Sequence, residues 1–223
     1  YNTDGNNTDL EIAMNWLKDH NADYPLSIEL LFDDEMDKEN YKNARDLVDK
    51  MEKLYGETEL SKEYRIRVAA KDGNQDELVQ QIEDGYKKYP DDWYFVNLQR
   101  IVDENVNKNT ESSIEVLKKF LKNNFKADAY TTLAKYYFDK GNSAEGIEQY
   151  EILLKKYPYA VGYFRDLGDI YFQEQKYDKA IENFKRCLEI APYVSSYWNR
   201  LAKCYDNEKK DDDAKKAYTN AID

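Results

Sequence analysis

The sequence is poor in the residues that usually build metal centres and nucleophilic active sites. It contains one histidine, His20, and two cysteines, Cys187 and Cys204, among 223 residues. Zinc sites draw three or four ligands mainly from these residue types, and two cysteines are too few for a disulfide framework. Phosphate-binding glycine loops and nucleophile elbows are also absent. We therefore expect no enzyme, no cofactor and no metal, and we expect two buried or half-buried free thiols.

Long apolar runs and an excess of positive charge are missing as well. No stretch of about 18 apolar residues occurs, so the sequence predicts no membrane-spanning helix. The 33 Lys and Arg residues are outnumbered by 45 Asp and Glu, which gives a net charge of −12. Because such a surface repels phosphate, we do not expect nucleic acid or an anionic membrane as a partner.

Glycine and proline are scarce, and this scarcity favours long helices with few tight turns. The prolines that end apolar-periodic stretches are Pro90, Pro158 and Pro192, and the first of their two intervals is twice the second. The pairs Gly73-Asn74 and Gly141-Asn142 are separated by the longer of these intervals. The shorter interval is the period of the chain, and a fixed period of about 34 residues is typical of a helical repeat protein.

Two further positions follow the same period. One is large and apolar in every window: Val48, Ile82, Val116, Tyr150, Phe184 and Tyr218. The position one helical turn earlier is small in five of six windows: Ala44, Leu78, Ser112, Gly146, Ala180 and Ala214. A small residue opposite a large one lets two helices pack closely. We therefore predict an all-α, right-handed α-solenoid of about six helix-turn-helix repeats with an N-terminal capping helix.

The predicted organisation has four parts. Residues 1–8 form a flexible polar tail, and residues 9–24 form the capping helix. Residues 25–126 hold three divergent repeats (25–58, 59–92 and 93–126), in which Lys62, Arg65, Gln99 and Asp103 occupy expected apolar positions. We expect these first helices to be rotated or shifted. Residues 127–223 hold three clear repeats (127–160, 161–194 and 195–223), of which the last is truncated.

The three clear repeats share one residue pattern. Their first helices carry an apolar stripe with spacing i, i+3, i+4 and i+7: Tyr130, Leu133, Ala134 and Tyr137, then Phe164, Leu167, Gly168 and Tyr171, then Trp198, Leu201, Ala202 and Tyr205. With small and aromatic residues in the second helices and a late proline, this pattern resembles the tetratricopeptide repeat. The resemblance implies a scaffold that binds a peptide or protein segment in a concave groove lined by first helices. The Tyr, Lys and Asn content is similar to that of bacterial members.

Helix geometry gives the candidate groove residues. A stripe beside the packing stripe is turned away from the core and has similar helical spacing. Its candidate binding residues are Thr131, Lys135, Phe138, Arg165, Asp169, Phe172, Asn199 and Lys203. The Lys, Arg and Asn side chains could hold a carboxylate or backbone carbonyls. Alternatively, the two phenylalanines pack on a neighbouring helix and the charged groups are solvated.

A carboxylate clamp of the kind that some tetratricopeptide domains use is not supported. Thr131, Asp166 and Ser196 stand where Lys or Asn would be needed, and only Arg200 fits the pattern. We therefore do not expect the chaperone partners that such a clamp implies.

Two other functions remain open from the sequence. The chain could be a structural subunit of a bacterial envelope assembly, similar to lipoprotein-like tetratricopeptide factors, or a regulatory or sensory segment of a larger protein. Because there is no initiator Met and the last window stops inside a helix, we expect truncation or processing, which leaves cytoplasm and periplasm both open as compartments. Partly uncovered faces of Tyr218 and Ile222 would favour self-association.

Overall fold

The computed structural model describes residues 12–17, 19–20 and 22–222, and this part of the chain contains helices and turns but no strand. Residues 12–17 and 19–20, within the predicted capping segment, are helical, and Met14 is buried there. The predicted polar tail, residues 1–8, lies outside the described residues. The chain divides into two compact units, Tyr1–Asn123 and Asn124–Asp223, which are described separately.

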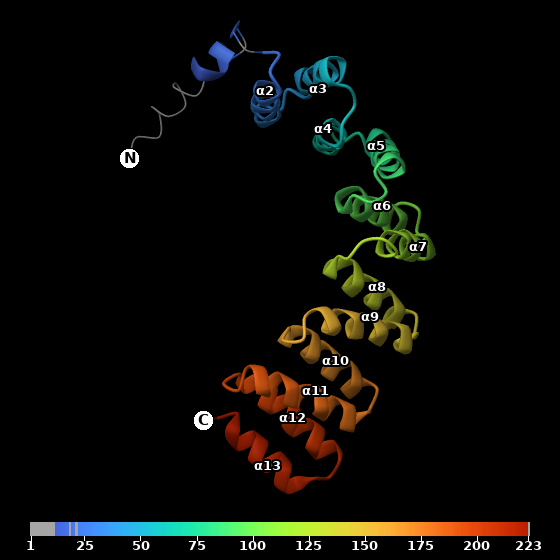
Figure 1. Ribbon diagram of the computed structural model, residues 1–223, viewed down its shortest axis with the longest axis vertical. Helices are drawn as coiled ribbons and strands as arrows, with labels where there is room; N and C mark the ends of the chain where they lie inside the picture. Colours follow the sequence, from blue (N-terminus) through green and yellow to red (C-terminus); the bar gives the residue numbers. More distant parts are fainter. Residues whose placement is uncertain (1–11, 18, 21, 223) are drawn as a thin grey trace. The chain divides into compact units, whose positions relative to one another are not determined.

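The labelled helices follow one another in pairs (Figure 1). The first unit contains α2 (Pro25–Asp37) and α3 (Tyr41–Tyr55), α4 (Glu59–Asp72) and α5 (Gln75–Lys88), and α6 (Trp93–Asn105) and α7 (Thr110–Leu121). The second unit contains α8 (Ala127–Asp139) and α9 (Ser143–Lys156), α10 (Val161–Gln173) and α11 (Tyr177–Ile190), and α12 (Ser195–Asn207) and α13 (Asp211–Asn220). Successive first helices begin one period apart, at Pro25, Glu59, Trp93, Ala127, Val161 and Ser195. The predicted all-α solenoid is confirmed.

The turn inside each helix pair contains one residue in the left-handed region of backbone space. These residues are Glu39, Gly73, Lys108, Gly141, Gln175 and Lys209. Glycine adopts this conformation at little cost, whereas an L side chain is strained there. Because four of the six turns carry a side chain, the backbone of the turn recurs more faithfully than its sequence does.

Close helix packing in the second unit depends on small residues that face aromatic rings. A Cβ atom at Gly168 of α10 would lie 2.6 Å from Cε1 of Phe184, whose ring is buried in α11. Cys187 and Cys204 lie in the same core as buried free thiols, as expected from the sequence. Burial raises the pKa of the Cys187 thiol to about 11 and that of Cys204 to about 12.

In the first unit, α4 and α6 keep the register of the other first helices, so the prediction that they are rotated or shifted is wrong. Lys62, Gln99 and Asp103 are buried at the packing positions. Each finds a polar partner there. Lys62 Nζ lies 3.7 Å from a carboxylate oxygen of Glu57, and Asp103 accepts from Gln99 Nε2 at 3.0 Å and from Ser112 Oγ at 2.7 Å. Buried polar groups are tolerated when they are paired in this way.

Ion pairs join successive helix pairs of this unit. Arg65 of α4 donates to Asp49 of α3 at 2.7 Å and also to Glu52 of α3. Arg45 of α3 donates to Glu77 of α5 at 2.8 Å. Polar contacts therefore supply part of the packing that aromatic residues supply in the second unit.

Candidate functional site

A hollow of about 240 Å³ lies between α10 and α12 in the second unit. Asp169 and Phe172 of α10 form one wall, and Arg200 and Lys203 of α12 form the other. Phe184 of α11 also lines it and is only 1% exposed, so it supplies a buried apolar floor. The hollow thus has an aromatic floor and a charged rim, on the face made by first helices.

Helix geometry brings these side chains together. Asp169 and Phe172 have i, i+3 spacing on α10, as do Arg200 and Lys203 on α12, and residues with this spacing lie on one side of a helix. Gly168 lets the ring of Phe184 come close to α10, because it places no Cβ atom in the way. The position of Phe184 in the floor therefore depends on Gly168, which directly precedes the rim residue Asp169.

The charges of the rim do not cancel. Arg200 Nε donates to Asp169 Oδ1 at 2.8 Å, and this ion pair joins α12 to α10. Lys203 is exposed, and its ammonium group has no ion pair within the part of the chain that the structure describes. Two cations and one carboxylate therefore surround the hollow, in a chain whose net charge is −12.

Three of the eight predicted groove residues, Asp169, Phe172 and Lys203, line this hollow. The stripe rule does not include Arg200 or Phe184. The sequence relates Arg200 only to the clamp pattern and Phe184 only to the large apolar position of the repeat. One feature of the sequence does point to Arg200: it lies three residues before Lys203, so the two side chains share one side of a helix.

The other predicted polar residues have separate surroundings. Thr131 Oγ1 donates to the carbonyl of Asp128 at 3.1 Å, and Asn199 Nδ2 donates to a carbonyl one turn earlier in its own helix. Arg165 pairs with its neighbour Asp166 at 2.6 Å. Lys135 is exposed on α8. None of these four residues lines the hollow between α10 and α12.

The two predicted phenylalanines occupy the same position in successive repeats but differ in their contacts. Phe138 packs on Gly146 of α9, because a Cβ atom there would lie 2.6 Å from its ring. Packing on a neighbouring helix was the alternative to a groove role for this ring. Phe172 also packs on a neighbouring helix, α11, where it meets the ring of Tyr177 edge-on with 5.4 Å between ring centroids, but in addition it lines the hollow.

Other predicted features lie outside the hollow. The ring of His20 stacks on Trp16, and its Nδ1 lies 3.0 Å from the Trp16 carbonyl oxygen. The hydroxyl of Tyr218 donates to Asp206 at 2.6 Å, whereas Ile222 is 87% exposed. Among the described residues, no group of three or more His, Cys, Asp or Glu side chains is arranged to hold a metal ion, and no helix is long and apolar enough to cross a bilayer.

Two family models of the tetratricopeptide repeat match the chain, one over residues 131–195 and the other over residues 195–223. No curated protein matches it. The two family matches cover both α10 and α12, which wall the hollow.

Several solved structures share the fold. The MamA protein is 20% identical, with a TM-score of 0.60, over 75% of this chain and 91% of that one. The C-terminal part of a tetratricopeptide repeat-containing protein from Cytophaga hutchinsonii is 14% identical, with a TM-score of 0.69, over 96% and 88% of the two chains. PilW, a type IV pilus biogenesis factor, is 14% identical, with a TM-score of 0.53, over 84% and 87%.

The helical fold and the family matches agree on one classification. The regular spacing of the first helices runs from Pro25 to Ser195, beyond the matched residues 131–223. Residues 131–223 therefore carry tetratricopeptide repeats, helical repeats of the class that serves as a scaffold for protein–protein interactions.

Proposed function

We propose that this scaffold binds a segment of another protein on the first-helix face of residues 124–223, with the hollow between α10 and α12 as the main anchor point. One observation carries the proposal: the same hollow is lined by an apolar floor, Phe184, and by a rim that combines Phe172 with three charged side chains, Asp169, Arg200 and Lys203. Recognition pockets commonly combine an apolar lining with a few well-placed polar groups. The proposed function is binding alone, with no catalysed reaction.

The rim indicates the chemistry of the bound segment. An apolar side chain would bury its surface against Phe172 and Phe184, and buried anchors of this kind dominate binding energy. A neighbouring carboxylate would meet the unpaired ammonium of Lys203 and the guanidinium of Arg200, which the Asp169 ion pair holds in place. Because the whole chain has a net charge of −12, a strongly acidic partner would be repelled at long range. The best ligand is therefore an apolar residue next to a single acidic one.

We also propose that each helix pair is one repeat, with the boundaries 25–58, 59–92, 93–126, 127–160, 161–194 and 195–223. The regularly spaced starts of the first helices support this division. On this assignment Asp169 and Lys203 occupy the same position in successive repeats.

Affinity capture from the native cell, followed by mass spectrometry, tests the binding site. We expect Lys203→Glu and Phe172→Ser to lose a partner that the unmodified chain retains. Lys155→Glu is the matched control, because Lys155 is also an exposed lysine, lies on α9 and does not line the hollow. Circular dichroism should show equal helicity in all variants. If both rim variants keep every partner, the hollow is not the anchor.

A further inference from the structure

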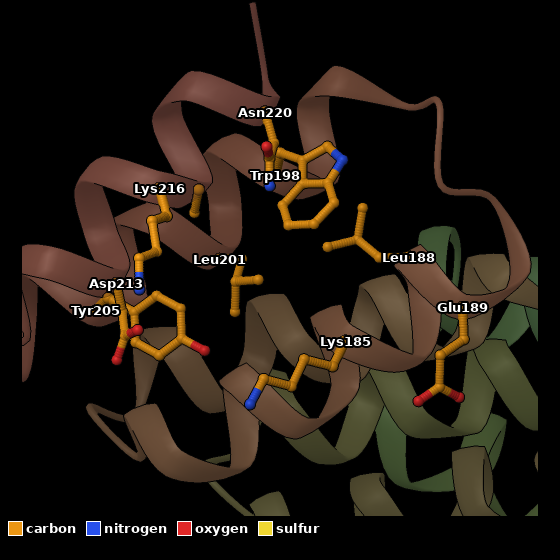
Figure 2. Close-up of a pocket in the computed structure, with 10 residues that line it drawn as sticks. Lys185, Leu188, Glu189, Trp198, Leu201, Tyr205, Asp213, Lys216 and Asn220 are labelled. Carbon is orange, nitrogen blue, oxygen red and sulfur yellow. The ribbon is translucent and has the colours of Figure 1, made fainter. Parts of the chain in front are cut away.

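A second groove, of about 410 Å³, lies between the second helices α11 and α13 (Figure 2). Trp198, Leu201 and Tyr205 of α12 line its floor, and Leu188 of α11 and Ala217 of α13 add apolar walls. The groove shares no lining residue with the hollow between the first helices. It therefore offers a separate surface on the side of the unit formed by second helices.

In the preceding helix pair, cations of the second helix cover the corresponding rings of the first. Phe164 and Tyr171 of α10 stand one period before Trp198 and Tyr205. Two cations of α11 lie over these rings. The guanidinium carbon of Arg186 is 5.6 Å from the centroid of Phe164, and Lys179 Nζ is 5.2 Å from the centroid of Tyr171.

On α13 the two covering cations are replaced. Asn220 and Asp213 stand one period after Arg186 and Lys179, and both line the groove. A short amide does not reach across an indole as a guanidinium does, and an aspartate carries the opposite charge. The groove over α12 is therefore open at Trp198, whereas the corresponding Phe164 ring of α10 is covered by Arg186.

The two ends of the open groove differ in charge. At one end, Lys185 Nζ lies 5.9 Å from the centroid of Tyr205, so this ring already has a cation. At the other end, the indole of Trp198 lies between Asn220 and Leu188, with no cation over it in the described structure (Figure 2). Its Nε1 donates to the carbonyl of Pro192 at 2.9 Å, which fixes the ring and satisfies its only donor.

A carboxylate stands near the uncovered ring. Glu189 lines the same groove, and its side chain is 58% exposed. In the covered groove, Arg186 contacts the ring of Phe164 and also pairs with Glu189. An incoming guanidinium could therefore stack on Trp198 and share the exposed Glu189 carboxylate with Arg186. A net charge of −12 also attracts basic segments at long range.

We propose that this groove binds a basic segment of a partner protein, with an arginine or lysine stacked on Trp198 and an apolar side chain over Leu201. A cation over a tryptophan face is the most favourable of the cation–π arrangements. At the Tyr205 end, the lining lysines Lys185 and Lys216 outnumber the Asp213 carboxylate, so a second cation is disfavoured there and the segment has one preferred direction (Figure 2).

Nuclear magnetic resonance of the indole N–H groups tests this assignment. The chain has three tryptophans, and the signal of Trp198 is identified as the one lost in Trp198→Phe. The probe is the blocked peptide Ac-RLAA-NH2, with Ac-ELAA-NH2 as the acidic control. We expect the basic peptide to shift the Trp198 signal saturably and the acidic peptide to leave it unchanged.

Asn220→Arg supplies the missing cation from within the chain and should weaken binding of the basic peptide about fivefold or more. Lys203→Glu, which alters the other hollow, should leave binding unchanged, so this proposal and the proposed function can fail separately. An unmoved Trp198 signal, equal binding by Asn220→Arg, or equal binding of the acidic peptide would each overturn the assignment.

Discussion

At the scale of single residues, glycines that admit aromatic rings are the most sensitive points of the second unit. Gly168→Ala would place a Cβ atom 2.6 Å from the ring of Phe184, which is buried and cannot swing away. We expect a loss of about 1–3 kcal/mol in the free energy of unfolding, measured by urea denaturation. Gly162→Ala is the matched control on the same helix, because nothing lies within 4 Å of its added Cβ atom. It should be neutral or stabilising, and equal losses in both variants would contradict this packing account.

The two cysteines give a second prediction at this scale. Burial raises the pKa of Cys187 to about 11 and that of Cys204 to about 12, so both remain protonated thiols at pH 8. Because the thiolate is the reactive form, a disulfide reagent should label neither cysteine quickly in the folded protein and both in denaturant. Raising the pH towards 11 should speed the labelling. Fast labelling of the folded chain at pH 8 would show that the thiols are accessible.

At the scale of helices and turns, the left-handed residues store strain that glycine would release. Gln175 and Lys209 have φ values of 61° and 59°, close to that of Gly141 at 77°. Gln175→Gly and Lys209→Gly should each raise the free energy of unfolding by about 1 kcal/mol, since an L residue is disfavoured there. Gly141→Ala is the reciprocal control and should lower it. Denaturant midpoints decide the sign, and a loss of stability in both glycine variants would contradict the turn geometry.

The repeat period was sufficient to predict the helical pairs. A few prolines and Gly-Asn pairs revealed the period, and the backbone of the turns and helix ends keeps it in the repeats where those residues are replaced. The register of α4 and α6 was harder to predict. Lys62, Gln99 and Asp103 look misplaced on an apolar stripe until their partners are known, and those partners lie on other elements or several residues away. Polarity alone therefore indicated a rotation that pairing makes unnecessary.

The candidate site shows a similar limit. A stripe rule identifies which side of a helix a residue occupies, and this was enough to select Asp169, Phe172 and Lys203. It does not distinguish Phe138 from Phe172. The two rings differ in their contacts because Gly146, on the helix after Phe138, leaves room for the Phe138 ring. The stripe rule also does not show that Arg200 crosses to Asp169, because that contact joins two different helices.

At the scale of the whole molecule, stacked repeats create surfaces on two sides of the second unit. One lies between first helices, over Phe184, and the other lies between second helices, over Trp198 and Leu201. The first surface has an excess of cations at its rim. The second has no cation over Trp198, whereas Arg186 covers the corresponding Phe164 ring one repeat earlier. Opposite ligand chemistries on the two sides would let one chain hold two different segments.

Site-specific photo-crosslinking in the native cell tests the central claim most directly. A photoreactive amino acid is placed at position 199 in one variant and at position 155 in another. Both native residues are exposed and neither lines the hollow, but Asn199 lies on α12 one turn before Lys203 of the rim. The account predicts a distinct crosslinked partner from position 199, lost on adding Phe172→Ser, and absent from position 155. Identical crosslinking patterns from the two positions would contradict binding at the hollow.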